Sequence, residues 1–520
     1  MPTPRYHGGA ALQHFPLNVP AFKGLNKQAR GAVLGPEWAT RMENTVLDSS
    51  NRVATRKGWK PRTTGTAAAG NFTQMIELDV SGSPHLIAVA DDSKVYKSTD
   101  GGDNWSDVTG TATITDTNMQ LQIFNDKLLG FQSSGTIIQY TGTTCSNLGA
   151  TSEPQGGVGL AAFGRLWVKS GPQTLKYCAL LDETDWTGSD AGTYDLTSVW
   201  QGQDEITAIA EFNGSLVIFS NKNVIVYTDG SGSALGLDPI TAYVADTING
   251  IGCIARDSVV PVKGDLWFLD DTGIHNLGRL ISERSNPLNN VSRNVQDELR
   301  GYIEITDMTK VRAIYSPRDR FYLLSLPLGS GSTENGVVFC FDTRGTLEDG
   351  AYRCSGIWNG MVPTAMIVEA ANLYLVSSIR VHTGEIGAYE AYYLDNMETY
   401  VMEYESGWTD LNTTDLKILK RISGLLFIQA ATTVVYKWAF DFVENFSTAS
   451  VIYPGASGVA EYGTSEYNVA EWGGGVNLRE KRVGGRGTGD YIKIGMTIDV
   501  DGDEVSCQQI NLYAKQGRIK

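Results

Sequence analysis

The chain has 520 residues, with 58 Gly and an aromatic content of 16 Phe, 11 Trp and 23 Tyr. Only 19% of the residues are charged, and the formal net charge is −16. So many aromatic residues and so few charges exclude intrinsic disorder, and the same composition excludes a coiled coil. Frequent Gly beside frequent aromatic residues favours many short strands joined by tight turns.

Positive charge is concentrated near the N-terminus, against the sign of the whole chain. Residues 1–65 contain ten Lys or Arg and three Asp or Glu, and the first 45 residues contain five Pro. This pattern predicts an extended arm over residues 1–48 that docks on an acidic surface, with one short helix near residues 37–47. A basic tail surrounded by solvent is the alternative.

The predicted arm has too few apolar residues to bury a core of its own, so we expect it to extend away from the body and to serve assembly. Deletion of residues 2–30 should then leave the thermal unfolding of the chain unchanged while preventing incorporation into a larger particle. The candidate assembly residues are Arg5, Lys23, Lys27 and Arg30.

From about residue 50 onward, short apolar runs alternate with Gly, Asn, Asp and Ser clusters. Similar units of three or four short runs begin near residues 76, 119, 159, 206, 252, 310 and 362. Units of about 40–50 residues with this pattern are typical of the blades of a β-propeller. We therefore predict an all-β protein with a β-propeller of about six to eight blades over residues 49–400. A set of β-sandwiches with irregular spacing is the alternative.

The pattern changes after about residue 400. Longer apolar runs predict a small C-terminal β-sandwich or barrel-like domain over residues 401–520, and a Gly-rich segment at 453–475 is a candidate partner contact. One clear helical pattern occurs, at residues 291–303. Helix should therefore make up less than about a tenth of the chain, well below the average for globular proteins.

One short motif has a defined structural role. Ser98, Asp100, Gly102 and Trp105 fit the pattern S-x-D-x-G-x-x-W, which resembles the Asp-box of sialidase-type propellers. The Ser and Asp side chains are expected to bind the amides of a turn, Gly to adopt positive φ, and Trp to pack between blades. An Asp-box is structural and lies away from the sialidase active site, so it does not indicate catalysis.

Catalytic and metal-binding patterns are absent from the sequence. The six Cys form no CxxC pair and the five His are scattered, so we expect no metal, no cofactor and no catalytic residues. The acidic residues Asp182, Glu183 and Asp185, and those in the segment 499–504, fit exposed turns better than a carboxylate pair or a calcium loop. No apolar run of 18 residues and no signal-peptide pattern is present, which favours folding in the cytosol without a membrane segment.

Residues 42–59, MENTVLDSSNRVATRKGW, resemble the start of the tail hub or nozzle proteins (tail tubular protein B-like) of short-tailed bacteriophages. Three further segments, at residues 164–196, 206–227 and 250–277, are similar to the same family. The resemblance extends over about residues 40–440. The chain departs from the family pattern at Ser49-Ser50, where a turn Gly is usual.

This resemblance implies a structural protein of the virion tail, assembled in the host cytoplasm, and not an enzyme. Six copies are expected to form a ring that continues the DNA channel below the portal and adaptor rings and supports the tail fibres. Its partners would be further copies of itself, the adaptor or head-to-tail connector, the fibres, and genomic double-stranded DNA in transit.

An acidic protein repels DNA phosphates, so we expect the surface that lines the channel to be net acidic or neutral. A carbohydrate-binding or carbohydrate-cleaving propeller of a virion or cell surface is the alternative function. The Asp-box and the 11 Trp motivate that alternative.

Overall fold

The structure is a computed structural model, and it is almost entirely β-sheet. It describes residues 11–17, 21–29, 31, 34–200, 204–230, 235–283, 290–328, 336–377, 384–455 and 477–517. Only 5% of the residues that the structure describes are helical, which confirms the expected low helix content. The two α-helices of the described part are α1 (Leu277–Glu283) and α2 (Gln296–Ile303), and α2 lies within the predicted helical segment 291–303.

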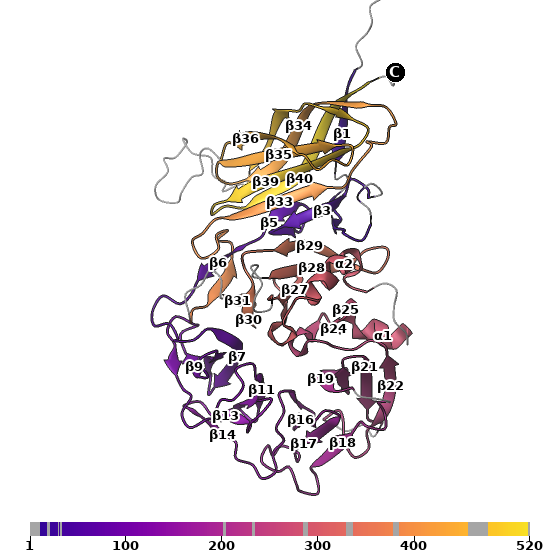
Figure 1. Ribbon diagram of the computed structural model, residues 1–520. Helices are drawn as coiled ribbons and strands as arrows, with labels where there is room; N and C mark the ends of the chain where they lie inside the picture. Colours follow the sequence, from indigo (N-terminus) through magenta and orange to yellow (C-terminus); the bar gives the residue numbers. More distant parts are fainter. Residues whose placement is uncertain are drawn as a thin grey trace, which may run out of the picture.

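The larger part of the chain is a β-propeller (Figure 1). Six separate sheets of three or four strands, and one four-stranded part of a larger sheet, follow one another around a central axis. The innermost strands are β7 (Phe72–Val80), β11 (Gln120–Phe124), β15 (Gly159–Ala162), β19 (Ile206–Phe212), β23 (Val260–Val262), β26 (Arg312–Ser316) and β30 (Pro363–Glu369). The predicted propeller of six to eight blades is confirmed.

The other strands of the propeller run outward from these inner strands, each antiparallel to the one before it. They are β8 (Ser83–Ala90), β9 (Val95–Ser98), β10 (Ser106–Asp107), β12 (Lys127–Phe131), β13 (Ile138–Tyr140), β14 (Cys145–Asn147), β16 (Arg165–Gly171), β17 (Thr174–Tyr177), β18 (Gly192–Asp195), β20 (Ser215–Ser220), β21 (Asn223–Thr228), β22 (Tyr243–Asn249), β24 (Asp265–Asp270), β25 (Gly273–Asn276), β27 (Phe321–Leu326), β28 (Val337–Thr346), β29 (Tyr352–Trp358), β31 (Asn372–Ser377) and β32 (Gly387–Glu390).

A strand from the N-terminal part of the chain completes the last blade. Strand β6 (Gly58–Pro61) pairs antiparallel with β32, with Trp59 opposite Tyr389 and Pro61 opposite Gly387. The blade β30–β31–β32–β6 packs against β7, where the propeller begins. The ring is therefore closed by hydrogen bonds between segments that lie far apart in the sequence.

The C-terminal domain consists of two sheets that share one large core. The seven-stranded sheet contains β37 (Asn477–Gly484), β34 (Lys417–Ile428), β40 (Val505–Gln516), β5 (Val53–Thr55), β4 (Thr45–Leu47), β1 (Leu12–Leu17) and β38 (Thr488–Gly489). The ten-stranded sheet adds to β26–β29 the strands β3 (Trp38–Glu43), β33 (Tyr400–Ser406), β39 (Ile492–Val500), β35 (Thr432–Phe440), β36 (Ser447–Tyr453) and β2 (Gly24–Leu25). One hydrogen-bonded sheet thus runs from the propeller into the C-terminal domain.

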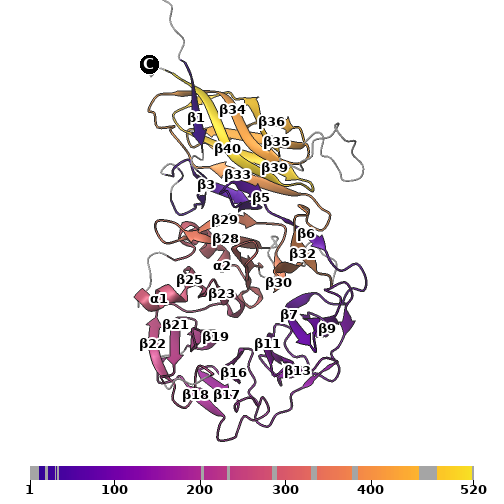
Figure 2. The ribbon, with the colours of Figure 1, turned by 180° about the vertical axis from the view of Figure 1, so that it is seen from behind.

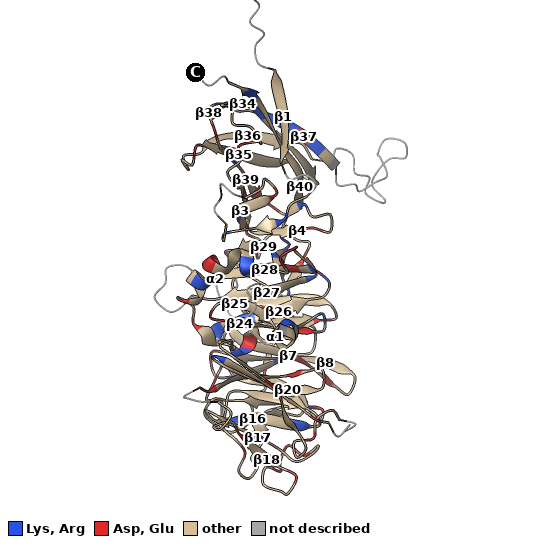
Figure 3. Cartoon of the chain, turned by 90° about the vertical axis from the view of Figure 1, so that its right-hand side faces the viewer, with Lys and Arg blue, Asp and Glu red and all other residues tan. Residues whose placement is uncertain are grey.

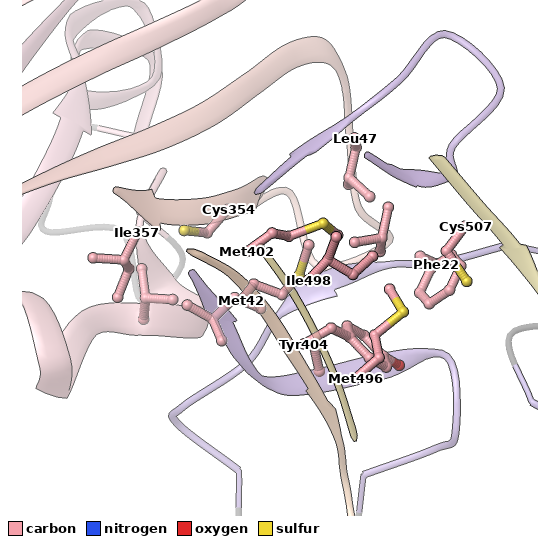
Figure 4. Close-up of a cluster of buried hydrophobic side chains, with 14 of the residues drawn as sticks. Phe22, Met42, Leu47, Cys354, Ile357, Met402, Tyr404, Met496, Ile498 and Cys507 are labelled. Carbon is pink, nitrogen blue, oxygen red and sulfur yellow. The ribbon is translucent and has the colours of Figure 1, made fainter. Parts of the chain in front are cut away.

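The N-terminal segment is extended, as predicted, but its described part does not leave the body. Strand β1 pairs with β40, and β3 lies between β29 and β33. Leu17, Phe22 and Leu25 are buried. Figure 4 shows Phe22 and Met42 packed among residues of the C-terminal domain. The expectation of an arm that projects from the protein is therefore corrected from residue 11 onward, and residues 1–10 lie outside the described part.

The short helix expected near residues 37–47 is wrong. These residues form strands β3 and β4, because both edges of β3 find partner strands and its apolar residues Ala39 and Met42 are buried in the shared core. Tertiary pairing overrides the weak local preference for helix at this position.

Candidate functional site

The junction between the propeller and the C-terminal domain is built around Arg56, whose side chain is completely buried. Its Nη1 and Nη2 donate to the two carboxylate oxygens of Asp395 at 2.8 and 2.5 Å, and its Nε donates to Asn44 Oδ1 at 3.1 Å. The guanidinium also lies over the ring of Tyr400, 4.1 Å from the centroid. Burial opposes the charge, but Asp395 holds the pKa of Arg56 above its ordinary value. The Arg56 guanidinium therefore stays charged although it is buried.

Two further polar residues of the segment 42–59 fix strand ends at the same junction. Asn44 has a φ of +52° and donates through Nδ2 to the carbonyl of Val401 at 2.8 Å. Asp48 accepts from Arg52 Nε at 2.5 Å and from Ser506 Oγ at 3.0 Å. These contacts connect the segment with strand β33 and strand β40 of the C-terminal domain.

Trp59 completes the junction on the propeller side. Its indole is buried against Gly387, so closely that a Cβ on this glycine would overlap the ring. Its backbone amide donates to the carbonyl of Leu394 at 2.8 Å. The arrangement couples closure of the propeller to attachment of the second domain.

The four Asp-box residues lie in one turn between β9 and β10. Asp100 Oδ1 accepts from the amides of Asp103 and Asn104, each at 3.0 Å, and from Ser98 Oγ at 2.7 Å. Gly102 has a φ of +95° and donates its amide to Ser98 Oγ at 2.9 Å. The hydrogen bond from the Asn104 amide, with that from Ser98, lowers the pKa of Asp100 to about 2. The carboxylate therefore stays ionised at neutral pH and binds the turn.

Trp105, the last residue of the motif, is buried between two blades. Its ring centroid lies 4.5 Å from that of Phe72 in β7, and the same cluster includes Val376 and Ile386 from the blade that β6 completes. Its Nε1 donates to Thr63 Oγ1 at 3.4 Å. The Asp-box thus lies where the ring closes and away from the propeller axis.

Two cavities lie near the axis of the propeller. One, of about 480 Å³, is lined by residues of all the inner strands, including Ile76, Leu121, Leu160, Ile209, Val260, Ala313 and Met366. The other, of about 690 Å³, is lined by Asp116, Lys169 and Glu205 among others. Arg256 and Asp257 line both cavities, so this pair lies between them.

The Arg256–Asp257 pair is held by a network that crosses the axis. Arg256 donates to the carbonyls of Asn118 and Gly157, each at 2.7 Å. Arg312 lies 3.0 Å from Asp257 and donates to the carbonyl of Thr73 at 3.0 Å. Burial opposes ionisation of Asp257, but the two guanidinium groups hold its pKa below the ordinary value. The Asp257 carboxylate is therefore ionised, and Arg256 and Arg312 balance its charge. Such a group suits a structural ion pair better than a proton donor.

The predicted assembly residues within the described part form ion pairs inside the chain. Lys23 Nζ lies 3.1 Å from Glu37, and Lys27 Nζ lies 3.8 Å from Glu298 of α2. Arg5 and Arg30 lie outside the described residues. The sequence did not predict these partners, because each ion pair depends on how the N-terminal segment packs against the rest of the chain.

The acidic residues near Trp186 form turns and ion pairs. Asp182 Oδ1 accepts from the amide and hydroxyl of Thr184 at 2.9 and 2.6 Å, and Glu183 is paired with Lys127. Asp185 accepts from the Gly188 amide at 2.7 Å. The acidic segment 499–504 connects β39 to β40 through a turn with Gly502 at positive φ.

No group of three or more His, Cys, Asp or Glu side chains in the described ranges is placed to hold a metal ion. All six Cys are unpaired and buried, and burial raises the pKa of Cys253 to about 12, so this thiol is not ionised at neutral pH. Within the part of the chain that the structure describes, no helix has the length and apolar character needed to cross a membrane.

Comparisons with known proteins find no matching family model and no matching curated protein. Solved structures with some similarity include a chain of a Mitotic Checkpoint Complex, with a TM-score of 0.39 and 11% identity over 64% of this chain and 95% of the other. The computationally designed protein Ika8 gives a TM-score of 0.36 at 10% identity, over 64% of this chain and 99% of its own. BBS1N, solved in complex with ARL6DN, gives 0.34 at 11% identity, over 64% and 97%. The fold assignment rests on the strand pairing described above.

Proposed function

We propose that this protein is a structural subunit of the tail nozzle or hub of a short-tailed bacteriophage. In this proposal, six copies form a ring that continues the DNA-ejection channel below the portal and adaptor rings and supports the tail fibres. The observation that carries the proposal is the place of the segment 42–59. Its Asn44, Asp48, Arg56 and Trp59, from the part of the sequence that resembles this family, all lie at the junction of the two domains.

A continuous sheet through both domains suits a mechanical role. Strand β3 pairs with β29 of the propeller through Ile357 and Glu43, and with β33 of the C-terminal domain over Ala39–Glu43. Bending at this joint would have to break hydrogen bonds of the sheet and expose part of the shared core. The wall of a DNA channel needs such stiffness, because it must keep its shape while the genome passes.

The charge of the chain also supports the proposal. The net charge of −16 disfavours retention of DNA, since affinity for DNA grows with each phosphate that Lys or Arg neutralises. A channel surface that is net acidic or neutral remains a prediction of this proposal. A basic lining would instead indicate a gate that grips DNA.

A glycan-binding propeller is supported less well. The cavity of about 690 Å³ has carboxylates in its wall, but none of the residues that line it is aromatic. Small-molecule sites usually combine aromatic and apolar walls with a few polar groups. In addition, Asp257 is already neutralised by Arg256 and Arg312.

Electron microscopy of the purified full-length chain tests the proposal directly. We expect closed rings of about six copies with a central tube, and gold-labelled antibodies against the chain should mark the tail of the intact particle. A chain that stays monomeric and hydrolyses or binds members of a glycan panel, with loss on Asp257→Asn, would overturn the structural proposal. Lys60→Gln, which removes one exposed ion pair with Glu390 remote from the cavity and adds no like charge, is the matched control.

A further inference from the structure

The seven-stranded sheet has one buried face and one face directed away from the shared core. In β34, Ile422 and Leu426 are buried, whereas Arg421 is exposed and Leu425 and Phe427 are half-buried. The neighbouring strands continue this outer face, with Tyr513 opposite Arg421. On β37, Arg482 lies opposite Ser423, and Leu478 lies opposite Phe427. We call this surface the basic sheet face.

Charge and apolar character occur together on this sheet. Strands β34, β37 and β40 contain seven Lys or Arg and one acidic residue, Glu480, although the whole chain carries −16. Among the seven, Lys417 is buried and Arg482 is paired with Glu480, whereas Lys420 and Arg421 are exposed. Blue segments lie on β34 and β37 in Figure 3. Leu12 and Leu478 are 44% and 48% exposed. The outer face of the sheet thus carries an excess of positive charge beside exposed apolar side chains.

A second group of exposed apolar residues lies in the loops that follow β17 and β21, and β17 lies at the end of the propeller remote from the C-terminal domain (Figure 2). Leu180, Leu181 and Leu235 converge over Gly164, each within 3.5 Å of where a Cβ of this glycine would lie. Ile240, 71% exposed, follows in the loop between β21 and β22. We call these four residues the leucine patch.

The backbone at the leucine patch is locally unfavourable for its sequence. Leu181 has a φ of +56°, a conformation that Gly and Asn adopt readily and that a large apolar residue rarely adopts. Its side chain is also 60% exposed. A residue that violates both the backbone preference and the preference for burial indicates a functional surface.

The surroundings of the leucine patch are acidic. The two segments that supply it, 178–191 and 229–242, contain six Asp or Glu and no Lys or Arg. Glu183 is paired with Lys127 and Asp190 with Arg165, which leaves an excess of four acidic residues. The basic sheet face and the leucine patch are therefore complementary in charge, and both expose apolar side chains to solvent. They lie at opposite ends of the molecule in Figures 1 and 2, so one copy cannot join its own two surfaces.

We propose that the basic sheet face of one copy docks on the leucine patch of a neighbouring copy. This inference rests on the proposed ring and assigns its contact surfaces. Two different surfaces make a heterologous contact, and repeated heterologous contacts produce a closed ring when the rotation closes. Because part of the attraction is ionic, the association should weaken as the Debye length falls from about 10 Å at 0.1 M salt to about 3 Å at 1 M.

The test uses one variant for each surface, in the full-length chain. Lys420→Glu with Arg421→Glu reverses two exposed charges of the basic sheet face. Leu181→Asn with Ile240→Asn replaces two of the four apolar side chains of the leucine patch, and Asn suits the positive φ at residue 181. Each variant alone should associate at least about tenfold more weakly than the wild type in mass photometry, because like charges or lost apolar contacts oppose docking. Lys60→Gln is again the matched control.

A mixture of the two variants gives the decisive readout. Each variant keeps one intact surface, so a heterologous contact predicts one-to-one dimers that cannot grow further. Rings that form as in the wild type from either variant would overturn the surface assignment and leave the proposed function standing. A wild-type chain that is monomeric at every concentration would overturn the ring and this inference together.

Cysteine cross-linking provides a measurement that does not depend on assembly strength. All six natural Cys are buried, so Leu478→Cys in one copy and Leu181→Cys in another introduce the only exposed thiols of the described residues. A disulfide-linked dimer should form in the mixture of the two proteins and in neither protein alone. Equal cross-linking in all three samples would contradict the proposed contact.

Duplex DNA is the competing occupant of the basic sheet face. A fluorescent duplex of 30 base pairs should bind the wild type weakly, and the Lys420→Glu/Arg421→Glu variant should bind it no less. Loss of duplex binding in this variant, with unchanged self-association, would assign the face to nucleic acid and overturn the proposal.

Discussion

Arg56 and Asp395, 339 positions apart in the chain, form a buried bidentate ion pair at the junction of the two domains. Arg56 precedes by two residues the strand that closes the propeller, and Asp395 precedes β33, the first strand of the C-terminal domain after the propeller. The pair therefore connects the strand that closes the propeller with the segment that leads into the C-terminal domain. Its low exposure makes it sensitive to any change that removes one partner.

Replacement of Arg56 by Met should lower the free energy of unfolding by about 3–5 kcal/mol, because Asp395 is left as an uncompensated buried charge. Urea denaturation followed by tryptophan fluorescence measures this change. The double variant Arg56→Met/Asp395→Leu should be less destabilised than the single variant, since an apolar pair carries no desolvation cost. A loss below about 1 kcal/mol in the single variant would show that the pair is dispensable.

Substitution of Gly387 by Ala should weaken the pairing of β32 with β6, which closes the propeller. The new Cβ would overlap the Trp59 indole, so we expect a loss of roughly 1–3 kcal/mol and faster proteolysis near residues 58–61. Gly301 in α2 is the matched control, because a Cβ there meets nothing within 4 Å. Gly301→Ala should be neutral or stabilising by up to about 1 kcal/mol. Equal effects of the two substitutions would contradict the role given to Gly387.

Truncation of Trp105 to Ala should destabilise the chain by about 3–5 kcal/mol, because it leaves a cavity between the first blade and the last. Trp105→Phe keeps an aromatic ring beside Phe72 and should cost less. Thermal unfolding of both variants at one pH provides the comparison. A change below about 1 kcal/mol for the Ala variant would mean that the indole is not part of the blade contact.

The stability of the folded chain should fall between about pH 6.5 and pH 4 through His275. Burial lowers the pKa of this side chain to about 4, although Asp271 opposes the shift, and its Nε2 lies 3.0 Å from Thr272 Oγ1 and 3.8 Å from Asp270. The unfolded chain binds the proton first as the pH falls, so protonation favours unfolding by about 3 kcal/mol in total. In a pH series of urea denaturations, the free energy of unfolding of the His275→Gln variant should change less between these pH values than that of the wild type. An unchanged slope would assign the loss to other groups.

Two N-terminal deletions test which part of the N-terminal segment stabilises the folded chain. Removal of residues 2–10 should leave thermal unfolding unchanged. Removal of residues 2–30 should destabilise the chain by at least about 4 kcal/mol, because it takes away the buried residues Leu17, Phe22 and Leu25. This corrects the sequence-based expectation for the longer deletion. A fully stable chain without residues 2–30 would show that the segment contributes little to the shared core.

Local patterns in the sequence predicted much of the propeller. Six of the seven predicted unit starts match an inner strand of the propeller. Residue 76 lies within β7, and the other five lie within two residues of the start of β11 (119), β15 (159), β19 (206), β26 (310) or β30 (362). Apolar alternation and turn residues act over a few neighbours, so they mark strands and turns before any long-range contact is known. The sequence likewise marked the turn that contains Asp100 and Gly102.

The partners of the N-terminal segment were decided only by the tertiary structure. The basic residues of 1–65 suggested an arm that reaches another subunit, yet Lys23 and Lys27 pair with Glu37 and Glu298 of the same chain. A charge pattern states the sign of a partner but not its position, and which strand edge β3 joins depends on edges formed hundreds of residues later. The sequence alone determined that the protein is built of strands in repeated units. Only folding determined that β6 closes the ring, that β3 joins two domains in one sheet, and that Arg256 and Asp257 cross the axis, because each requires segments distant in sequence to meet in space.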